Sequence, residues 1–326
     1  MLAKTAYLTH TMTLSASKNL GLVVNAALAL AFLGLGLLQL VILPLALLPA
    51  DPAWGWLLLL LVLLTNTAWA LIHEAIHGVL LPHKAANRAA GRVLSVLFGA
   101  AFDLLRWGHL LHHALSRTRR ERSEVYVAGV DKRLSFTLNY YFRLTGGLYW
   151  YEVLGGLIFL LPRPVIRWAA RRLGSEHNVV EALSEKLLEP ATLRAVRLDG
   201  WLVIALYSTA FILYAEHAWM LLAALLARAF LISVVDNAFH YGTPLEDIRY
   251  ARNLALPAWA SALLLHFNLH GAHHQRPGLA WWQLAAHHAQ SQAGFQGNWT
   301  AALLAQFRGP IPEHQLISGA GGRPCR

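Results

Sequence analysis

Residues 53–77 read AWGWLLLLLVLLTNTAWALIHEAIH, and this stretch decides the kind of fold to expect. Residues 53–72 carry no charge and are long enough for one helical crossing of a bilayer, which takes about 20 residues. His73 and His77 follow at once, four residues apart, so their rings would lie on one face of a helix. The stretch therefore predicts a membrane helix that ends in half of a metal site.

Two further histidine clusters repeat this arrangement. They are His109-Leu-Leu-His112-His113 and His270-Gly-Ala-His273-His274, and each follows an apolar segment. Imidazole suits iron, zinc, copper and nickel, and one ion uses about four to six ligands. Eight clustered histidines therefore predict two ions. His240, at the end of another apolar segment, is a ninth candidate ligand.

The composition places this pattern in a membrane. Of the 326 residues, 56% are apolar and only 13% are charged, and the mean hydropathy is +0.44. These values differ from those of soluble globular domains and predict an integral membrane protein. Four apolar segments are expected to cross the bilayer as two helical hairpins: residues 19–48, 53–72, 200–215 and 218–235.

Two other apolar segments, residues 94–107 and 144–161, are expected to be interfacial or re-entrant helices. The first is short, and basic residues flank the second on both sides, so both flanks favour the cytoplasm. Four crossings then leave both termini and all the histidine clusters on the cytoplasmic side. We expect the inner membrane of a bacterium as the location.

The expected fold is an all-α integral membrane protein with four transmembrane helices in two hairpins, interfacial helices and a cytoplasmic, histidine-rich, metal-binding cap. It is expected as one domain, residues 1–326, with an N-terminal tail (1–18) and a flexible C-terminal tail (311–326). The net charge of +10 predicts contact with anionic lipid headgroups rather than nucleic acid, because the arginines flank membrane segments. A single cysteine, Cys325, excludes an internal disulfide and an iron–sulfur cluster built by one chain.

The third cluster extends the pattern further. It reads Asn268-Leu-His270-Gly-Ala-His273-His274-Gln-Arg-Pro277 and is followed by Trp281 and Leu284. With the other two clusters, it resembles the membrane-bound fatty acid desaturase family, whose mark is three histidine boxes after paired transmembrane helices. Ala280 and Ala285 stand where the family usually has proline. The second box continues into a basic rather than an acidic or Asn-rich sequence.

The resemblance implies a di-iron centre that activates O2 and oxidises a lipid C–H bond. Its ligands would be His73, His77, His109, His112, His113, His240, His270, His273 and His274. Introduction of a double bond into a lipid acyl chain is the first expectation, and hydroxylation or ketolation of a lipid or carotenoid is the alternative. No haem-binding segment of the cytochrome b5 kind is present, so electrons are expected from a separate ferredoxin, rubredoxin or cytochrome b5.

Other residues near the boxes are candidates for supporting roles. Asp236, Asn268 and Glu74 are the nearest acceptors that could orient ligand rings, although Asp236 could equally be a solvated helix end and Asn268 a helix N-cap. The aromatic residues expected to line an acyl tunnel, or else to anchor the protein at the membrane interface, are Phe239, Trp281 and Trp282.

Two hypotheses that assign the chain to other classes of protein remain: a zinc metalloprotease and a metal carrier. His73-Glu74-x-x-His77 is also the zinc metalloprotease signature, in which Glu74 would be the general base for a water on the metal. That reading leaves the second and third boxes unexplained. A metal carrier would be expected to line a path across the bilayer with its ligands instead of placing them at helix ends.

Overall fold

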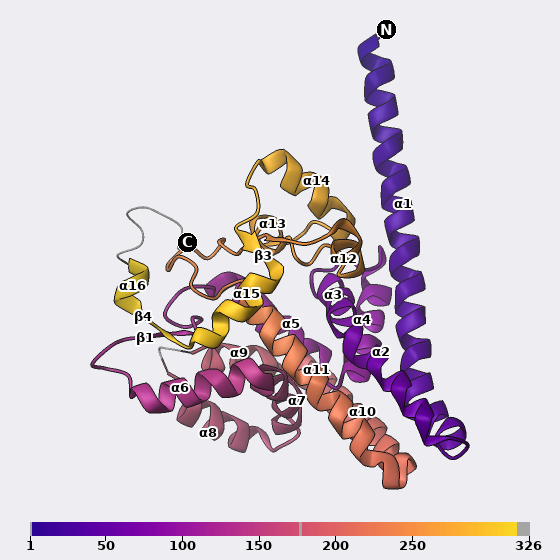
Figure 1. The fold of residues 1–326 in the computed structure, drawn as a ribbon, viewed down its shortest axis with the longest axis vertical. Helices are drawn as coiled ribbons and strands as arrows, with labels where there is room; N and C mark the ends of the chain where they lie inside the picture. Colours follow the sequence, from indigo (N-terminus) through magenta and orange to yellow (C-terminus); the bar gives the residue numbers. More distant parts are fainter. Residues whose placement is uncertain (1, 176–177, 318–326) are drawn as a thin grey trace.

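The computed structural model describes residues 2–175 and 178–317, with side chains from residue 19 onward, and this part of the chain is mostly helical (Figure 1). Its few strands are two residues long. They form two parallel pairs, β1 (Val125–Tyr126) with β4 (Ile311–Pro312) and β2 (Leu254–Ala255) with β3 (Gly297–Asn298). The pairs join distant loops and build no sheet core, so the fold is all-α as expected.

The N-terminal helices form a long arm and a bent return. The chain runs downward in Figure 1 through α1 (Leu2–Leu37) and the π-helix η1 (Leu38–Leu47), and it turns where Asp51 accepts a hydrogen bond from the Ala53 N–H. It returns through η2, α2 and α3, whose bounds are Pro52–Leu57, Leu58–Leu63 and Thr65–Ile76. The return bends by 43° next to Thr65, whose hydroxyl bonds the Leu61 carbonyl.

The next two helices make a sharp corner. α4 (Lys84–Phe98) and α5 (Phe102–Leu115) meet at 100°. Gly99 permits this corner, because it ends α4 in the left-handed conformation with φ of 96°. The apolar residues 94–107 therefore lie on both sides of a corner and form no straight helix.

A second hairpin contains α10 (Pro190–Tyr214) and α11 (Ala218–Ala238), joined by η4 (Ala215–His217). Arg228 of α11 donates a hydrogen bond to the Tyr207 hydroxyl of α10, which brings the two arms together. Figure 1 shows this turn and the turn between η1 and η2 at the lower end of the molecule, away from α13.

The remaining helices surround these two hairpins. On one side lie α6, η3, α7, α8 and α9, with bounds Arg133–Phe142, Arg143–Gly147, Leu148–Ile158, Arg163–Leu173 and Val180–Leu187. Above them lie the C-terminal helices α12, α13, α14, α15, η5 and α16, with bounds Ala258–Leu263, His270–Gln275, Trp281–Ser291, Trp299–Ala305, Gln306–Arg308 and Glu313–Ile317.

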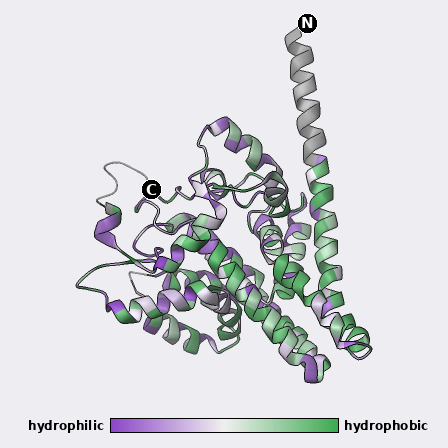
Figure 2. Ribbon diagram, in the orientation of Figure 1, coloured by the Kyte–Doolittle hydropathy of each residue, from purple (hydrophilic) through white to green (hydrophobic). Residues whose placement is uncertain are grey.

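Apolar side chains identify the segments that suit a bilayer. Asn19–Leu47 and Pro190–Ala238 are long and apolar enough to cross a membrane, and two bent helix pairs, residues 52–76 and 84–115, would bring the number to four. Figure 2 shows hydrophobic residues along these helices, and hydrophilic ones mainly in the loops and outer helices. The described part of the chain therefore has between two and four candidate spans.

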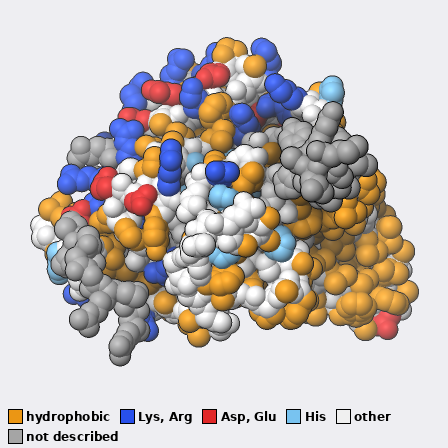
Figure 3. All heavy atoms as spheres, turned by 90° about the horizontal axis from the view of Figure 1, so that it is seen from above, with side chains coloured by type: hydrophobic (Ala, Val, Ile, Leu, Met, Phe, Trp, Pro, Cys, Tyr) orange, Lys and Arg blue, Asp and Glu red, His pale blue; other side chains and the backbone are white. Residues whose placement is uncertain are grey.

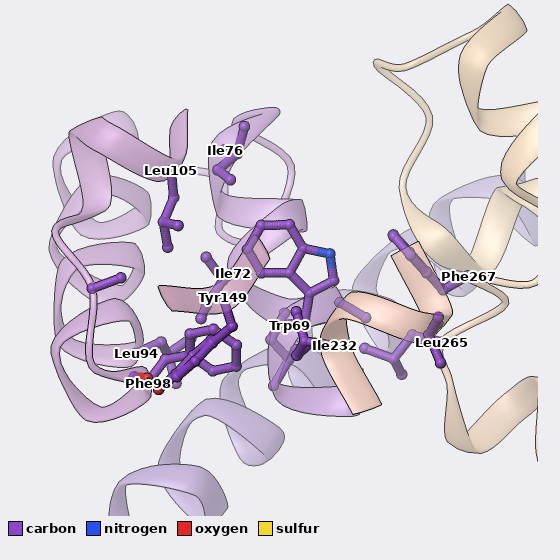
Figure 4. Packing of buried hydrophobic residues seen from close by; sticks show 14 of the residues in the cluster. Trp69, Ile72, Ile76, Leu94, Phe98, Leu105, Tyr149, Ile232, Leu265 and Phe267 are labelled. Atoms are coloured by element: carbon purple, nitrogen blue, oxygen red, sulfur yellow. Dashed lines mark hydrogen bonds between the residues drawn. The ribbon is translucent and has the colours of Figure 1, made fainter. Parts of the chain in front are cut away.

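An apolar core connects the hairpins to the upper part of the molecule. Figure 4 shows Trp69 at its centre, with Phe98 and Tyr149 on one side and Leu265 and Phe267 on the other. All five residues are buried, and they come from α3, α4, α7 and the loop before α13. Because protein interiors are closely packed, this core fixes the mutual positions of the helices that carry the histidines.

The two tails differ from the expectation. Helix α1 already includes residues 2–18, which were expected to precede the first helix. Residues 311–317 pack against the body: β4 pairs with β1, and Arg122 forms a 2.6 Å ion pair with Glu313. In this structure residues 311–317 therefore lie against the body, while residues 318–326 and Cys325 lie outside the described residues.

Candidate metal centre

The nine predicted ligand residues come from four parts of the fold. His73 lies in the last turn of α3, and His77 caps its C-terminal end. α5 carries His109, His112 and His113, α13 carries His270, His273 and His274, and His240 follows the end of α11. The apolar core holds these elements together, since Ile72, Leu105, Phe239 and Phe267 belong to one buried cluster.

The structure brings the nine histidines into two adjoining groups. The first group contains His73, His77, His109, His113 and His273, and the second contains His112, His240, His270 and His274. Within each group, one nitrogen from every ring lies within 4.8 Å of the others. The groups touch, because the ring centroids of His113 and His274 are 4.4 Å apart. Each group has the number of ligands that one metal ion uses.

The spacing of the ring nitrogens fits metal ligands. In the first group, the Nε2 atom of His273 lies 3.0 Å from that of His73 and 2.9 Å from that of His113. The Nε2 atom of His109 lies 3.0 Å from those of His77 and His113. Neighbouring ligands on one octahedral ion are about 3.0 Å apart when metal–nitrogen bonds are about 2.1 Å long.

Hydrogen bonding among the rings cannot satisfy these nitrogens. A neutral imidazole has one N–H donor, so several Nε2 atoms that all face one another cannot each be donor and acceptor in turn. His240 makes the point most clearly, because both of its ring nitrogens are buried without a hydrogen-bond partner among the described residues. Its ring lies 4.6 Å from that of His112 and 4.9 Å from that of His274. Metal ions would satisfy these buried lone pairs.

The protonation state of His240 and of the three histidines of α13 also suits metal binding. Burial lowers the pKa of His270 and His273 well below the ordinary value, and neighbouring histidines lower it further. The pKa of His240 and that of His274 are lowered for the same reasons. These imidazoles are therefore neutral at pH 7 and keep a free lone pair for a metal.

Of the three residues expected to orient the ligands, Asn268 and Glu74 have other partners. Asn268 accepts a hydrogen bond from the Ser261 hydroxyl and donates one to the Leu254 carbonyl, so it holds the loop before α13. Glu74 is buried and accepts a hydrogen bond from the Trp281 N–H. Asp236 lines a polar pocket together with His112 and His240.

Glu121 is a ligand-orienting residue that the sequence reasoning missed. Its Oε1 lies 3.1 Å from the Nδ1 of His112, while the Nε2 of the same ring faces His274 at 3.2 Å. A carboxylate on the nitrogen away from the metal fixes the tautomer and raises the basicity of a histidine ligand. The loop after α5 folds back to place this residue, with the Arg117 N–H bonded to the Glu121 carbonyl.

We expect Glu121→Gln to lower the metal affinity of the second group by about 10–100-fold, because the charge that supports His112 is lost while the shape of the side chain is kept. Competition with a chelator on purified protein measures this change. Glu185→Gln, at an exposed position on α9, is the matched control. Equal metal retention in both variants would show that Glu121 does not support His112.

The predicted substrate-lining residues separate into two sets. Phe239 is fully buried and stacks on His270, with ring centroids 4.5 Å apart, so it borders the second group. Trp281 instead donates its indole N–H to the Asn25 side chain, and Trp282 lies next to Gly21. Both tryptophans therefore pack against α1, and the structure brings only Phe239 of the three into contact with a predicted ligand.

The site and fold define a helical chain with candidate membrane spans and two histidine groups, each able to hold a metal ion. Comparison with known proteins agrees: the family described as Fatty acid desaturase matches residues 51–301, which is well over half of the chain. The chain belongs to this membrane fatty acid desaturase family, which confirms the resemblance. Searches among curated proteins and among solved structures returned no match.

Family membership makes the chain an oxidoreductase, and nothing in the structure supports a protease. His73 and His77 share a group with three other histidines, whereas a catalytic zinc site keeps three protein ligands and an open position. Glu74, which would be the base, contacts Trp281 instead. The clustering of all three boxes also argues against a metal carrier, because the ligands gather at one place.

Proposed function

We propose that this protein is an O2-dependent di-iron desaturase that introduces a double bond into a lipid acyl chain. One observation carries the proposal: nine histidines converge in two adjoining groups within a chain of the desaturase family. The overall reaction balances as the loss of two hydrogens from the chain, with O2, two electrons and two protons giving two water molecules.

The proposed ligands divide between the ions as the structure groups them. One iron would be held by the five histidines of the first group and the other by the four of the second. Bound there, the two ions would supply the oxidising power that an unactivated C–H bond needs and that no protein side chain provides. Neutral imidazoles would hold them without adding negative charge close to a membrane.

Aromatic residues would exclude water on one side of the centre, and a polar pocket would admit protons on the other. Phe267 packs against His73 with ring centroids 5.1 Å apart, Phe239 packs against His270, and Trp69 packs its ring edge against His109 at 6.4 Å. These aromatic contacts keep the apolar side of the centre dry. The polar pocket beside His112 and His240, which Glu121 and Asp236 also line, gives water and protons a way in from the other side.

The proposed topology follows the two hairpins. We propose four crossings with the two hairpin turns outside the cytoplasm and the histidine groups inside it, in the inner membrane of a bacterium. Both turns lie at the end of the molecule away from α13, which agrees with this topology. Cysteine substitutions at Glu216 and at Arg119 would report the two sides through labelling by an impermeant thiol reagent in intact cells.

A separate electron carrier would reduce the centre. Figure 3 shows lysine and arginine side chains gathered on one part of the face seen from above, apart from an apolar area. Opposite charges speed association, so this surface favours an acidic carrier such as a ferredoxin, a rubredoxin or a cytochrome b5. Exposed lysines and arginines between residues 119 and 172 include Arg119, Arg120, Lys132, Arg133, Arg167, Arg171 and Arg172.

The reaction can be tested with purified protein in lipid vesicles, supplied with O2 and a reduced ferredoxin. Mass spectrometry of the acyl chains should find a product two hydrogens lighter, and none with the His273→Ala variant. A product that is heavier by one oxygen atom would show that the reaction is hydroxylation and not desaturation. Unchanged lipids, with two irons bound and reduced, would overturn the assignment to acyl chains.

The division between two ions has its own test. His77 contributes only to the first group and His240 only to the second. We therefore expect His77→Ala and His240→Ala each to lower the iron content by about one ion per chain, because each removes a ligand from one group. Iron analysis of detergent-purified protein measures this. Loss of both ions in both variants would indicate a single cooperative site.

A further inference from the structure

A second pocket lies within the candidate membrane spans and takes no part in the proposed reaction. Its walls come from α1, η1, α2, α3 and α4, and it holds about 480 Å³ of space, its open mouth included. Only about 40 Å³ of it has room for the centre of a water-sized molecule, so a long ligand would lie along an open groove and not inside a closed cavity. Most of the lining is apolar: Phe32, Leu35, Leu40, Leu61, Leu64, Ala68, Leu94, Leu97 and Phe98.

One charged side chain, Arg228, reaches this pocket from the middle of α11. It is only 7% exposed. Its Nη1 donates to the Phe98 carbonyl at 3.1 Å and to the Tyr207 hydroxyl at 3.3 Å, while its Nε is buried without a partner. In the described part of the chain, no carboxylate forms an ion pair with this guanidinium.

An arginine so placed is costly for the fold. A buried cation without an opposite charge loses much of its favourable hydration, and charged residues within membrane segments commonly mark functional sites. The contact with the Phe98 carbonyl offsets part of the cost, since Phe98 is at the C-terminal end of α4. The Phe98 ring, whose centroid lies 5.2 Å from the guanidinium carbon, offsets a further part. Among the described residues, the Nε donor still has no partner and the charge has no carboxylate beside it.

We propose that this pocket binds a single-chain fatty acid, with its carboxylate on Arg228 and its chain along the apolar walls. The guanidinium supplies charge and a free N–H for the carboxylate, and the walls supply burial for a hydrocarbon chain. Arg228 is ten residues from either end of α11, about 15 Å along the helix, which is too deep for a phospholipid phosphate.

The bound fatty acid would not be the substrate at the metal centre. Phe98 lines the pocket, and its ring packs against Trp69 at 6.0 Å, which in turn packs against His109. Figure 4 shows Phe98 and Trp69 as neighbours in the buried core. This aromatic pair closes the pocket toward the histidines. The site is therefore a separate one, suited to sensing free fatty acid, and it does not depend on the proposed reaction.

The binding test uses a palmitate analogue with a photoreactive tail on the purified full chain, followed by peptide mapping. Crosslinks are expected on the wall residues of α1, α2 and α4. Palmitate should compete for labelling, whereas methyl palmitate, which lacks the charge, should compete about tenfold less well. Crosslinks confined to the lipid-exposed surface, or equal competition by the ester, would overturn the proposal. Competition by phosphatidylglycerol at palmitate's potency would assign the site to a lipid phosphate instead.

Two variants separate binding from folding. Arg228→Gln should weaken palmitate binding about tenfold and leave the ester unaffected. Because Arg228 also holds the end of α4, Ala68→Phe serves as a second variant that fills the pocket and keeps the guanidinium. Gly34→Leu is the control, since a side chain there meets open space. If both pocket variants still preferred palmitate to methyl palmitate as wild type does, the proposed site would be wrong. If His273→Ala lost this preference, the site would not be separate from the metal centre.

Discussion

Replacing His273 with alanine is expected to abolish turnover and to lower the iron bound to the first group to background. The Nε2 atom of this residue contacts those of His73 and His113, so it lies in the middle of the five-histidine group. Its loss leaves four ligands on two remaining helices and an opening on the α13 side. Iron analysis and the lipid assay measure the two effects.

The control for this variant is His217→Ala. His217 lies in the turn between α10 and α11, outside both groups, so its replacement should leave iron content and turnover unchanged. Both variants should also remain in the membrane fraction, because the apolar helices and not the metal support insertion. Normal turnover by His273→Ala would mean that the first group is not part of the catalytic centre.

The second large effect is expected on stability, from Arg117→Met. Arg117 is 1% exposed and forms a 2.7 Å ion pair with Glu124, which is equally buried. It also donates hydrogen bonds to the carbonyls of Thr243 and Pro244. Removal of one partner of a buried pair leaves an uncompensated charge and costs about 3–5 kcal/mol. Denaturant unfolding in detergent micelles should report this loss.

Arg119→Met, two residues away at an exposed position, is the matched control and should change stability little. The Arg117 variant should also lose iron from the second group. Its guanidinium connects the loop that carries Glu121 to the loop that follows His240. Equal unfolding curves for the two variants would show that the buried pair does not support the fold.

The candidate ligands could be predicted from the sequence because their spacing depends only on helix geometry. His109, His112 and His113 share one side of α5. The division of these three between two groups could not be predicted, since it depends on the packing of α5 against both α3 and α13. His240 belongs to no box, and only its position after an apolar segment made it a candidate.

The residues around the ligands were harder to predict, because their contacts depend on how the chain folds back after α5. Asp236 and Asn268 were chosen because they are close to ligands in the sequence, but the residue that bonds a ligand ring is Glu121. Nine positions separate it from His112, and the chain between them reverses at Arg117, which adopts a positive φ of 65°. A non-glycine residue in that conformation is uncommon, so no turn signal revealed the reversal.

The hairpins and the corner illustrate the same limit of local patterns. Apolar length predicted the helices around residues 19–48 and 218–235, which the structure contains. The 100° corner at Gly99 depends on long-range contacts: the Tyr149 hydroxyl and Arg228 both donate to the Phe98 carbonyl. Residues 51 and 130 positions away from Phe98 in the sequence therefore stabilise a turn that a local pattern does not specify.

The distribution of the ligands over the helices has a consequence for how the protein matures. Helix α13 contributes to both groups, and it is synthesised after all the other candidate ligand residues, which lie between His73 and His240. A ribosome-bound chain that has not reached residue 270 lacks His273 from one group and both His270 and His274 from the other. Neither group is complete before then, so a metal ion would gain its full set of histidines only after α13 has been made, and chains terminated before α13 would lack part of both groups.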